Sequence, residues 1–357
     1  FTMTDTDGCT LQLVVHTDDC LLSFPSTASG RAFKAALLQR FDGTDEGPVE
    51  HLLGCTVSRD ATHLHLSQEQ YADEILARFG MTDCNPSATP MDPNTRLLAS
   101  DRPAVVDPVR RLRYQEITGC LQFMACWTRP DLTFTANQLG KHCSNPGEIH
   151  MATATKALRY LKGTKALGIT YSRNLPDLNS LLLWSDSDWA SDTETRCSLS
   201  AWVATLNGGA ISWKSKQAPR VASSTTESEF VAASKTSDEA LWLRRCMEAI
   251  NLPQKTATPL FCDNRAVRMI SENPVHRELS KFIDFRVHRL KEHVADGVVR
   301  VIDCPTQDML ADTLTKQLPG PAYARHTRVQ LGLDPHTSPA PPACFAPRNV
   351  TVQQRGG

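Results

Sequence analysis

The sequence predicts an α/β protein: a mixed sheet with flanking helices occupies its second half, and an α+β segment followed by a helical stretch precedes it. Three observations predict this class. Apolar runs after residue 178 follow the order of three strands, a helix, a strand, two helices, a strand and a helix. Short strand patterns alternate with helical ones before residue 86, and a proline-rich stretch comes next.

The amino-acid composition limits which binding partners and which cellular locations are expected for this protein. In 357 residues, 38 Lys and Arg stand against 39 Asp and Glu, so a polyanionic partner must be held by a local basic patch or through metal ions. The cysteines contain no Cys-x-x-Cys pair, which predicts reduced thiols. No run approaches the roughly 20 apolar residues of a membrane span, and the first residues lack a secretory signal. We expect an intracellular protein, cytoplasmic or nuclear, without membrane contact.

An α+β segment is expected over residues 1–85. Two apolar runs, Leu11 to Val15 and Cys20 to Phe24, predict a hairpin that carries Asp18 and Asp19 at its exposed tip. The pattern then predicts a helix over 32–41, a second hairpin over 52–66 and a helix over 68–79 that Gly80 ends.

Residues 86–113 are expected to form an extended linker, because prolines at 86, 90, 93, 103 and 108 support neither a helix nor a central strand. Apolar residues at helical spacing over 114–127 and 150–162 then predict two packed helices. We therefore expect a helical connection over residues 114–177.

A complete α/β domain is expected over residues 178–318. Three antiparallel strands are predicted, and a long helix over 226–250 leads to a fourth strand. A right-handed crossover through that helix should place the fourth strand parallel to an earlier one in the same sheet. The predicted strands are 181–186, 199–206, 210–214, 259–263 and 298–302. Two further helices are predicted to begin at 264 and 279, and a last helix is predicted over 308–316. The tail, 319–357, is expected to be largely disordered.

Four acids lie at the ends of these elements. Asp186 ends the first strand, Glu229 opens the long helix, Asp263 ends the fourth strand and Asp312 begins the last helix. If the first and fourth strands are neighbours, about 4.8 Å apart, their carboxylates repel each other unless a cation lies between them. Oxygen ligands suit Mg²⁺, and two such ions about 4 Å apart can promote phosphodiester cleavage. Taken singly, each acid could instead form a turn or complement a helix dipole.

Five motifs surround these acids: Trp184-Ser-Asp-Ser-Asp-Trp-Ala190, Ile211-Ser-Trp-Lys-Ser-Lys216, Ser224-Thr-Thr-Glu-Ser-Glu-Phe230, Phe261-Cys-Asp-Asn264 and Leu310-Ala-Asp-Thr-Leu-Thr-Lys316. In this order they resemble the ribonuclease H domain of copia-class (Ty/copia) retrotransposon Pol polyproteins. The implied fold is an RNase H-like mixed five-stranded sheet. The implied reaction is cleavage of the RNA strand of an RNA–DNA hybrid with two Mg²⁺ ions, for which Mn²⁺ is an alternative. The resemblance assigns catalysis and metal binding to Asp186, Glu229, Asp263 and Asp312, and it leaves Asp188 and Glu227 as neighbours.

The upstream half resembles the reverse transcriptase of the same family. The motif Gln12-Leu-Val-Val-His-Thr-Asp-Asp19 resembles the Tyr-Val-Asp-Asp hairpin, and similar motifs extend the resemblance over residues 9–330. It implies that residues 1–85 are a palm and thumb remnant in which Asp18 and Asp19 are vestigial polymerase acids. We expect no polymerisation by this chain, because the palm's other carboxylate belongs well upstream of this hairpin. The rest of Pol is an implied partner, and a virus-like particle is an alternative location.

Basic residues in two places are candidates for phosphate contacts. Lys214, Lys216 and Arg220 follow the third strand, whereas Lys281, Arg286 and Arg289 lie on or near a later helix. A solvated helix face is the alternative for the second group. The family usually has Lys-His-Ile-Asp where this chain has Lys281-Phe-Ile-Asp284.

Three functions follow from the sequence. The first is a Mg²⁺-dependent ribonuclease acting on RNA–DNA hybrids within a retrotransposon polyprotein. The second is a degenerate or domesticated copy that binds nucleic acid without cutting it. The third is a reverse transcriptase that needs a separately supplied upstream half.

Overall fold

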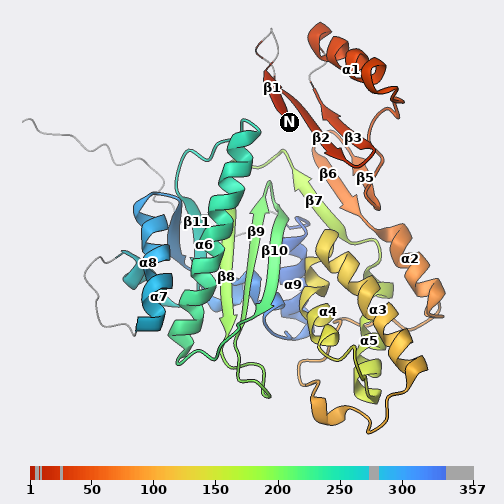
Figure 1. Cartoon of the computed structure of the whole chain (residues 1–357), viewed down its shortest axis with the longest axis vertical. Coiled ribbons are helices and arrows are strands. Elements are labelled where there is room, and N and C mark those ends of the chain that lie inside the picture. The colour runs from red at the N-terminus through yellow and green to blue at the C-terminus, as the bar shows by residue number, and fades with distance from the viewer. Residues whose placement is uncertain (5–7, 9, 25–26, 273–280, 335–357) are drawn as a thin grey trace, which may run out of the picture.

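A computed structural model describes residues 1–4, 8, 10–24, 27–272 and 281–334. The described residues form three sheets with helices around them (Figure 1). Among them, no helix has both the length and the apolar character needed to cross a membrane.

The first sheet contains the predicted N-terminal hairpin. It consists of β1 (Thr2–Thr4), β2 (Thr10–His16) and β3 (Asp19–Ser23), and α1 (Ala28–Phe41) follows it. His16 pairs with Asp19, so the turn consists of Thr17 and Asp18, and Thr17 has a φ of 54°. Positive φ is typical of the two-residue turns that join antiparallel strands.

A second sheet joins the hairpin that follows α1 to a strand from the predicted helical connection. Its order is β4 (His51–Leu52), β5 (Cys55–Arg59), β6 (His63–Ser67) and β7 (Gly168–Ser172), all antiparallel. The sequence pattern did not predict β7. Its first residue lies so close to β6 that a Cβ on Gly168 would be 2.1 Å from the Leu66 carbonyl oxygen.

Four helices pack beside this sheet: α2 (Glu69–Arg78), α3 (Pro108–Trp127), α4 (Thr133–Gly140) and α5 (Glu148–Thr164). Helix α3 begins six residues before its predicted start, so the predicted linker over 86–113 is wrong for its last six residues. The Asp107 carboxylate accepts hydrogen bonds from the backbone N–H groups of Val109 and Arg110, and proline is tolerated at the first helical position. Two 3₁₀ turns, Ala99–Asp101 and Pro130–Leu132, precede and follow α3.

The predicted mixed sheet is present in the second half. Its order is β10 (Gly209–Gln217), β9 (Leu199–Leu206), β8 (Leu182–Asp188), β11 (Thr258–Cys262) and β12 (Val299–Asp303). The first three strands in chain order are antiparallel, and β11 is parallel to both β8 and β12. The predictions of the fold class and of a parallel fourth strand are therefore confirmed.

Helices cover both faces of this sheet (Figure 1). The crossover helix α6 (Thr225–Ala249) packs on one face with α7 (Arg265–Glu272) and α8 (Lys281–Ala295). On the other face, the stacked rings of Trp184 and Phe261 contact residues 309–311 and Val329.

The C-terminal segment differs from its prediction. Residues 308–316 form no α-helix; most of them lie in two short 3₁₀ turns, η3 (Thr306–Asp308) and η4 (Leu310–Leu314). A further helix, α9 (Gly320–Gln330), buries Tyr323 and Val329. The prediction that residues 319–357 are largely disordered is therefore wrong for α9, and residues 335–357 lie outside the described part of the chain.

Candidate metal centre and nucleic-acid interface

Two of the predicted acids come together because β8 and β11 are neighbours. Cys262 pairs with Ser185, so Asp186 and Asp263 follow side by side at the same end of the two parallel strands. The Asp186 side chain is almost completely buried, and Asp263 is partly buried. Strand pairing thus brings together two carboxylates that lie 77 positions apart (263 − 186) in the chain.

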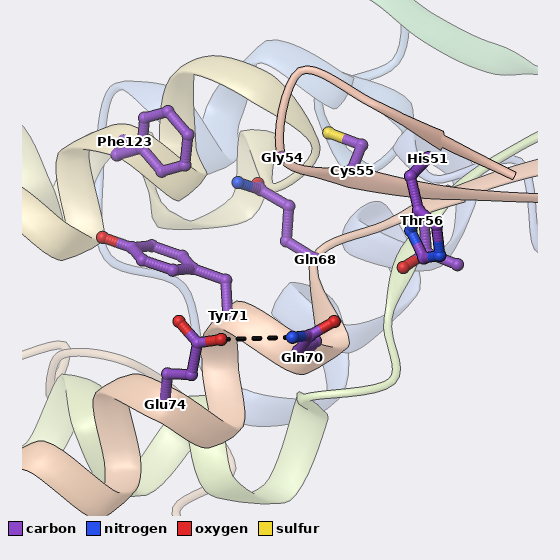
Figure 2. A pocket seen from close by; sticks show the side chains of 9 residues that line it. All are labelled: His51, Gly54, Cys55, Thr56, Gln68, Gln70, Tyr71, Glu74 and Phe123. Atoms are coloured by element: carbon purple, nitrogen blue, oxygen red, sulfur yellow. Dashed lines mark hydrogen bonds between the residues drawn. The ribbon is translucent and has the colours of Figure 1, made fainter.

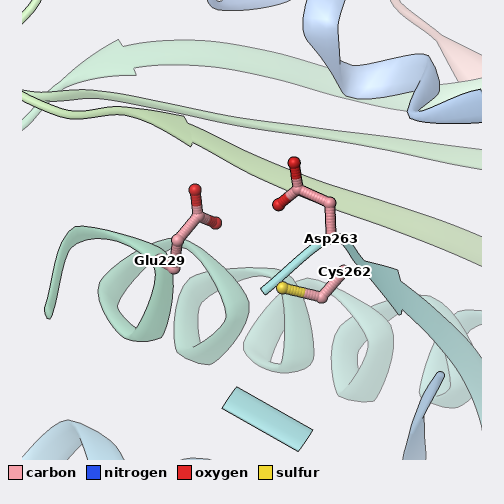
Figure 3. Close-up of side chains that lie close together, drawn as sticks. All are labelled: Glu229, Cys262 and Asp263. Atoms are coloured by element: carbon pink, nitrogen blue, oxygen red, sulfur yellow. The ribbon is translucent and has the colours of Figure 1, made fainter. Parts of the chain in front are cut away.

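Glu229 reaches the same site from the first turns of α6. The Ser224 hydroxyl caps this helix by accepting a hydrogen bond from the Glu227 backbone N–H. Figure 3 shows the carboxylates of Glu229 and Asp263 beside the thiol of Cys262, and one ligand atom of each residue lies within 4.8 Å of the others. Glu229 is only 4% exposed, and its Oε2 has no hydrogen-bond partner among the described residues.

The fourth acid is contributed by η4. Asp312 is buried, and its Oδ1 lies 2.9 Å from the Lys316 ammonium nitrogen. The Thr315 hydroxyl donates to the Asp186 carboxylate, which attaches η4 to β8. The short 3₁₀ turns therefore bring a carboxylate, a hydroxyl and an ammonium group to the ends of β8 and β11.

The electrostatics of the site are dominated by crowded carboxylates. Burial, followed by the charges of Asp186 and Asp263, raises the pKa of Glu229 to about 10. Burial and the Asp186 charge also raise the pKa of Asp312 to about 7, and the same two causes raise the pKa of Asp263. Burial alone would lower the pKa of Lys316, but the charges of Asp186 and Asp312 outweigh it and the pKa is raised. The negative charge exceeds what Lys316 can compensate, as expected for a site that binds cations.

The acids beside this tetrad lie in different environments. Glu227 accepts hydrogen bonds from the backbone N–H and the hydroxyl of Ser223, so its carboxylate is used locally at the start of α6. Asp188 is partly buried at the end of β8, and burial followed by the charge of Asp186 raises its pKa.

Two residues at the centre were missed by sequence reasoning, although both lie inside quoted motifs. Lys316 lies four residues after Asp312, and this spacing could have identified the pair. Cys262 was overlooked because a single apolar-looking residue in a strand is usually core.

Three of the predicted basic residues come together around a fourth. Three positive charges repel the ammonium group of Lys235 on α6. They belong to Lys214 and Lys216 on β10 and to Arg286 on α8. Burial, followed by these three positive charges, lowers the pKa of Lys235 to about 8. We call Lys214, Lys216, Lys235 and Arg286 the basic cluster. Lys235 was missed because only the packing of α6 against its neighbours reveals its surroundings.

The other predicted basic residues are arranged differently. Arg289 forms an ion pair with Asp238 at 2.8 Å, so its charge is partly compensated. Arg220 is exposed after β10, and the side chain of Lys281 lies outside the described residues. Asp18 and Asp19 are exposed at the tip of the first hairpin.

A separate pocket of about 360 Å³ lies between the turn after β4, α2 and α3 (Figure 2). Tyr71 and Phe123 line it, with their rings edge to face at 5.1 Å. Gln68 also lines it and accepts a hydrogen bond from the Thr128 hydroxyl. None of the four acids of the candidate centre lines this pocket.

Sequence and structure comparisons identify proteins that this chain resembles. A family model described as reverse transcriptase (RNA-dependent DNA polymerase) matches residues 1–93. The Pol polyprotein of transposon TNT 1-94 from Nicotiana tabacum is 33% identical over 312 residues, which are 86% of this chain and 23% of that protein. The Pol polyprotein of transposon RE2 from Arabidopsis thaliana is 32% identical over 334 residues, which are 94% of this chain and 22% of that protein. The chain thus spans less than a quarter of either relative.

A solved structure, RNase H1 from Halobacterium salinarum, is 14% identical and covers 38% of this chain and 93% of its own length, with a TM-score of 0.30. The sequence relatives define the class of this chain as that of retrotransposon Pol polyproteins. Within that class, the chain belongs to the copia-type family.

Proposed function

We propose that the second half of this chain is a Mg²⁺-dependent endonuclease that cleaves the RNA strand of RNA–DNA hybrids, as part of a reverse transcriptase and ribonuclease H polyprotein. The observation that carries this proposal is the convergence of four carboxylates, from four separate elements, on one site with little compensating positive charge. A core that needed only stability would not collect these repelling groups.

The donor set fits Mg²⁺. All four acids offer hard oxygen ligands, and the Oε2 of Glu229, which has no hydrogen-bond partner in the described part of the chain, is a buried acceptor available to a cation. Asp186, Glu229, Asp263 and Asp312 would hold two Mg²⁺ ions, or Mn²⁺. When bound, such ions supply an activated water and stabilise the departing oxygen.

The chain's own residues orient this donor set. The Thr315 hydroxyl fixes one oxygen of Asp186, and Lys316 holds the Asp312 carboxylate through its ion pair. Because the strand ends and the capped start of α6 are held by backbone hydrogen bonds, the carboxylates are positioned before any ion binds.

The basic cluster would bind the phosphates of the hybrid. Because the net charge of the chain is −1, binding of a polyanion requires such a local concentration of positive charge. Lys214 also lies 5.5 Å from the centroid of the Trp202 ring, which restricts where its ammonium group can lie.

Incubation of the purified chain with a labelled RNA–DNA hybrid and Mg²⁺ tests the proposal. We expect the parent chain to cut the RNA strand, and we expect Asp263→Asn to reduce cutting by at least about a hundredfold, as is typical when a group that stabilises the transition state is removed. Asp296→Asn is the matched control, because Asp296 is exposed at the end of α8. Binding of the hybrid without cutting by the parent would instead identify a degenerate copy.

We also propose that this chain does not polymerise by itself. Asp18 and Asp19 lie at an exposed turn, and the upstream part of the Pol relatives is the proposed partner. Primer extension on the same hybrid, with and without that upstream part, tests this. Extension by this chain alone would refute it.

A further inference from the structure

Cys262 contributes a sulfur atom to an otherwise oxygen-rich centre. The residue is 1% exposed, and it belongs to the apolar cluster between the sheet and α6. Asp263 follows it directly at the strand end. Figure 3 shows the Cys262 sulfur on the α6 side of the site, beside Glu229 and Asp263.

We propose that Cys262, Glu229 and Asp263 form a binding site for a thiophilic divalent cation of the Zn²⁺ class, and that this ion excludes Mg²⁺ from the centre. The proposal rests on the proposed function in one respect, because two of its three ligands are also proposed Mg²⁺ ligands. It adds a regulatory property that the four carboxylates alone would not have.

The geometry of the three ligand atoms supports this site. One atom of each residue lies within 4.8 Å of the other two. In tetrahedral zinc sites, Zn–S bonds of about 2.3 Å and Zn–O bonds of about 2.1 Å place neighbouring ligand atoms roughly 3.6 Å apart. Side-chain adjustments of about 1 Å would therefore complete the coordination.

A second observation points to a ligand independently of the cysteine. The Oε2 atom of Glu229 is buried and lacks a hydrogen-bond partner among the described residues, in a side chain that is 4% exposed. A buried acceptor without a partner costs free energy that a bound cation would recover. Glu229 is therefore available both to a hard ion and to a soft one.

The choice between the two ions follows from the sulfur. Mg²⁺ requires oxygen ligands and would leave Cys262 unused, whereas Zn²⁺ and Cd²⁺ bind thiolates strongly. On binding, the Cys262 S–H bond breaks, its proton passes to water and a sulfur–metal bond forms, with no change of oxidation state. Because Glu229 and Asp263 are shared, occupancy by Zn²⁺ and by Mg²⁺ is mutually exclusive.

Titration of the full chain with Cd²⁺, a spectroscopic probe for Zn²⁺, tests this site. Cd²⁺ bound to thiolate gives a sulfur-to-metal absorption band in the ultraviolet. We expect the parent chain to show a band that Cys262→Ala and Cys262→Ser both lack, with Cd²⁺ affinity about tenfold or more weaker in each. Cys55→Ala is the matched control, because Cys55 is another buried cysteine outside the centre and should retain the band.

Competition provides the second measurement. Added Mg²⁺ should weaken the Cys262-dependent band, and Glu229→Gln should reduce it. A Cd²⁺ band of equal strength in the parent and in both Cys262 variants would overturn the inference, as would a band insensitive to Mg²⁺.

The spectroscopic readout also separates this inference from the proposed function. Hybrid cleavage without a Cys262-dependent band would refute the thiophilic site and leave the nuclease intact. A Cys262-dependent band in a chain that never cuts the hybrid would refute the nuclease and leave the metal site.

Discussion

Arg129 is a fully buried guanidinium that depends on one carboxylate. Its Nε and Nη2 atoms donate to the two oxygens of Asp131 at 2.9 and 2.7 Å, and neither side chain is exposed. The Tyr160 hydroxyl donates to the same carboxylate at 2.7 Å. The pair joins the residues after α3 to the end of α5, because Arg129 also donates to the Thr164 carbonyl oxygen.

Removal of the Arg129 side chain should therefore strongly destabilise the folded chain. We expect Arg129→Met to lower the free energy of unfolding by about 3–5 kcal/mol, because Asp131 would remain buried without its counter-ion. Urea unfolding measures the change. The control is Arg110→Met, which removes a partly exposed partner of Asp107 and should cost about 1 kcal/mol or less. Equal losses in the two variants would contradict the prediction.

Lys235 should contribute to nucleic-acid binding more than its partly buried position suggests. We expect Lys235→Gln to weaken binding of an RNA–DNA hybrid and to reduce the slope of log affinity against log salt by about 1. Fluorescence anisotropy at several salt concentrations measures both. Lys255→Gln, an exposed lysine beyond α6, should leave the slope unchanged. An unchanged slope in Lys235→Gln would remove this residue from the interface.

At the scale of single elements, β7 depends on close contact with β6. We expect Gly168→Ala to destabilise the chain by about 1–3 kcal/mol, because its Cβ would collide with the backbone of Leu66 and force the strands apart. Gly119→Ala in α3 is a control of opposite sign. Gly119 is an exposed position with open space for a Cβ, so the substitution should stabilise the helix by about 0.5–1 kcal/mol. Thermal unfolding of both variants tests the contrast.

The elements that the sequence predicted well have strong local patterns. Strands β8 and β9, the capped helix α6 and the parallel strand β11 could be read from apolar periodicity and the crossover rule. Asp186, Glu229 and Asp263 could be placed because each lies near the end of such an element, whereas Asp312 lies within η4, where the predicted helix does not form. The motif resemblance, rather than periodicity, chose them from among their acidic neighbours.

The elements that were missed are held by distant contacts. Helix α9 begins at Gly320, between Pro319 and Pro321, and these three residues look like a linker. It is stabilised by burial of Val329 and by the Tyr323 hydroxyl, which donates to the Asp131 carbonyl oxygen at 2.5 Å. No local pattern encodes a partner 192 residues away.

At the scale of the whole molecule, buried histidines link stability to pH. The pKa of His326 and that of His142 are both lowered to about 4, and burial is the largest cause in each case. Burial also lowers the pKa of His150, whose ring stacks on His142 with centroids 4.1 Å apart. Because the folded pKa values lie below the unfolded value of about 6.5, their stabilising contribution is complete above that pH and is lost as the pH falls toward 4.

Substitution of one histidine separates this effect from that of the buried carboxylates. Their raised pKa values stabilise the folded state as the pH falls, which is the opposite direction. We expect the parent chain to lose stability relative to His326→Gln by up to about 1.4 kcal/mol per pH unit between about pH 6.5 and pH 4.5. Urea unfolding of both chains across this range measures the difference. Parallel stability profiles would show that His326 does not titrate on unfolding.

The end of β7 abuts the beginning of β10, where a Cβ on Gly209 would lie 2.7 Å from the Thr170 carbonyl oxygen. The Tyr171 hydroxyl donates to the Ala210 carbonyl oxygen, and the Ser172 backbone N–H donates to the Asn207 carbonyl oxygen. An outermost strand with free backbone groups can recruit a second molecule and start aggregation. Here the chain blocks one end of that strand with its own neighbouring sheet, which protects a concentrated preparation against edge-to-edge self-association at this position.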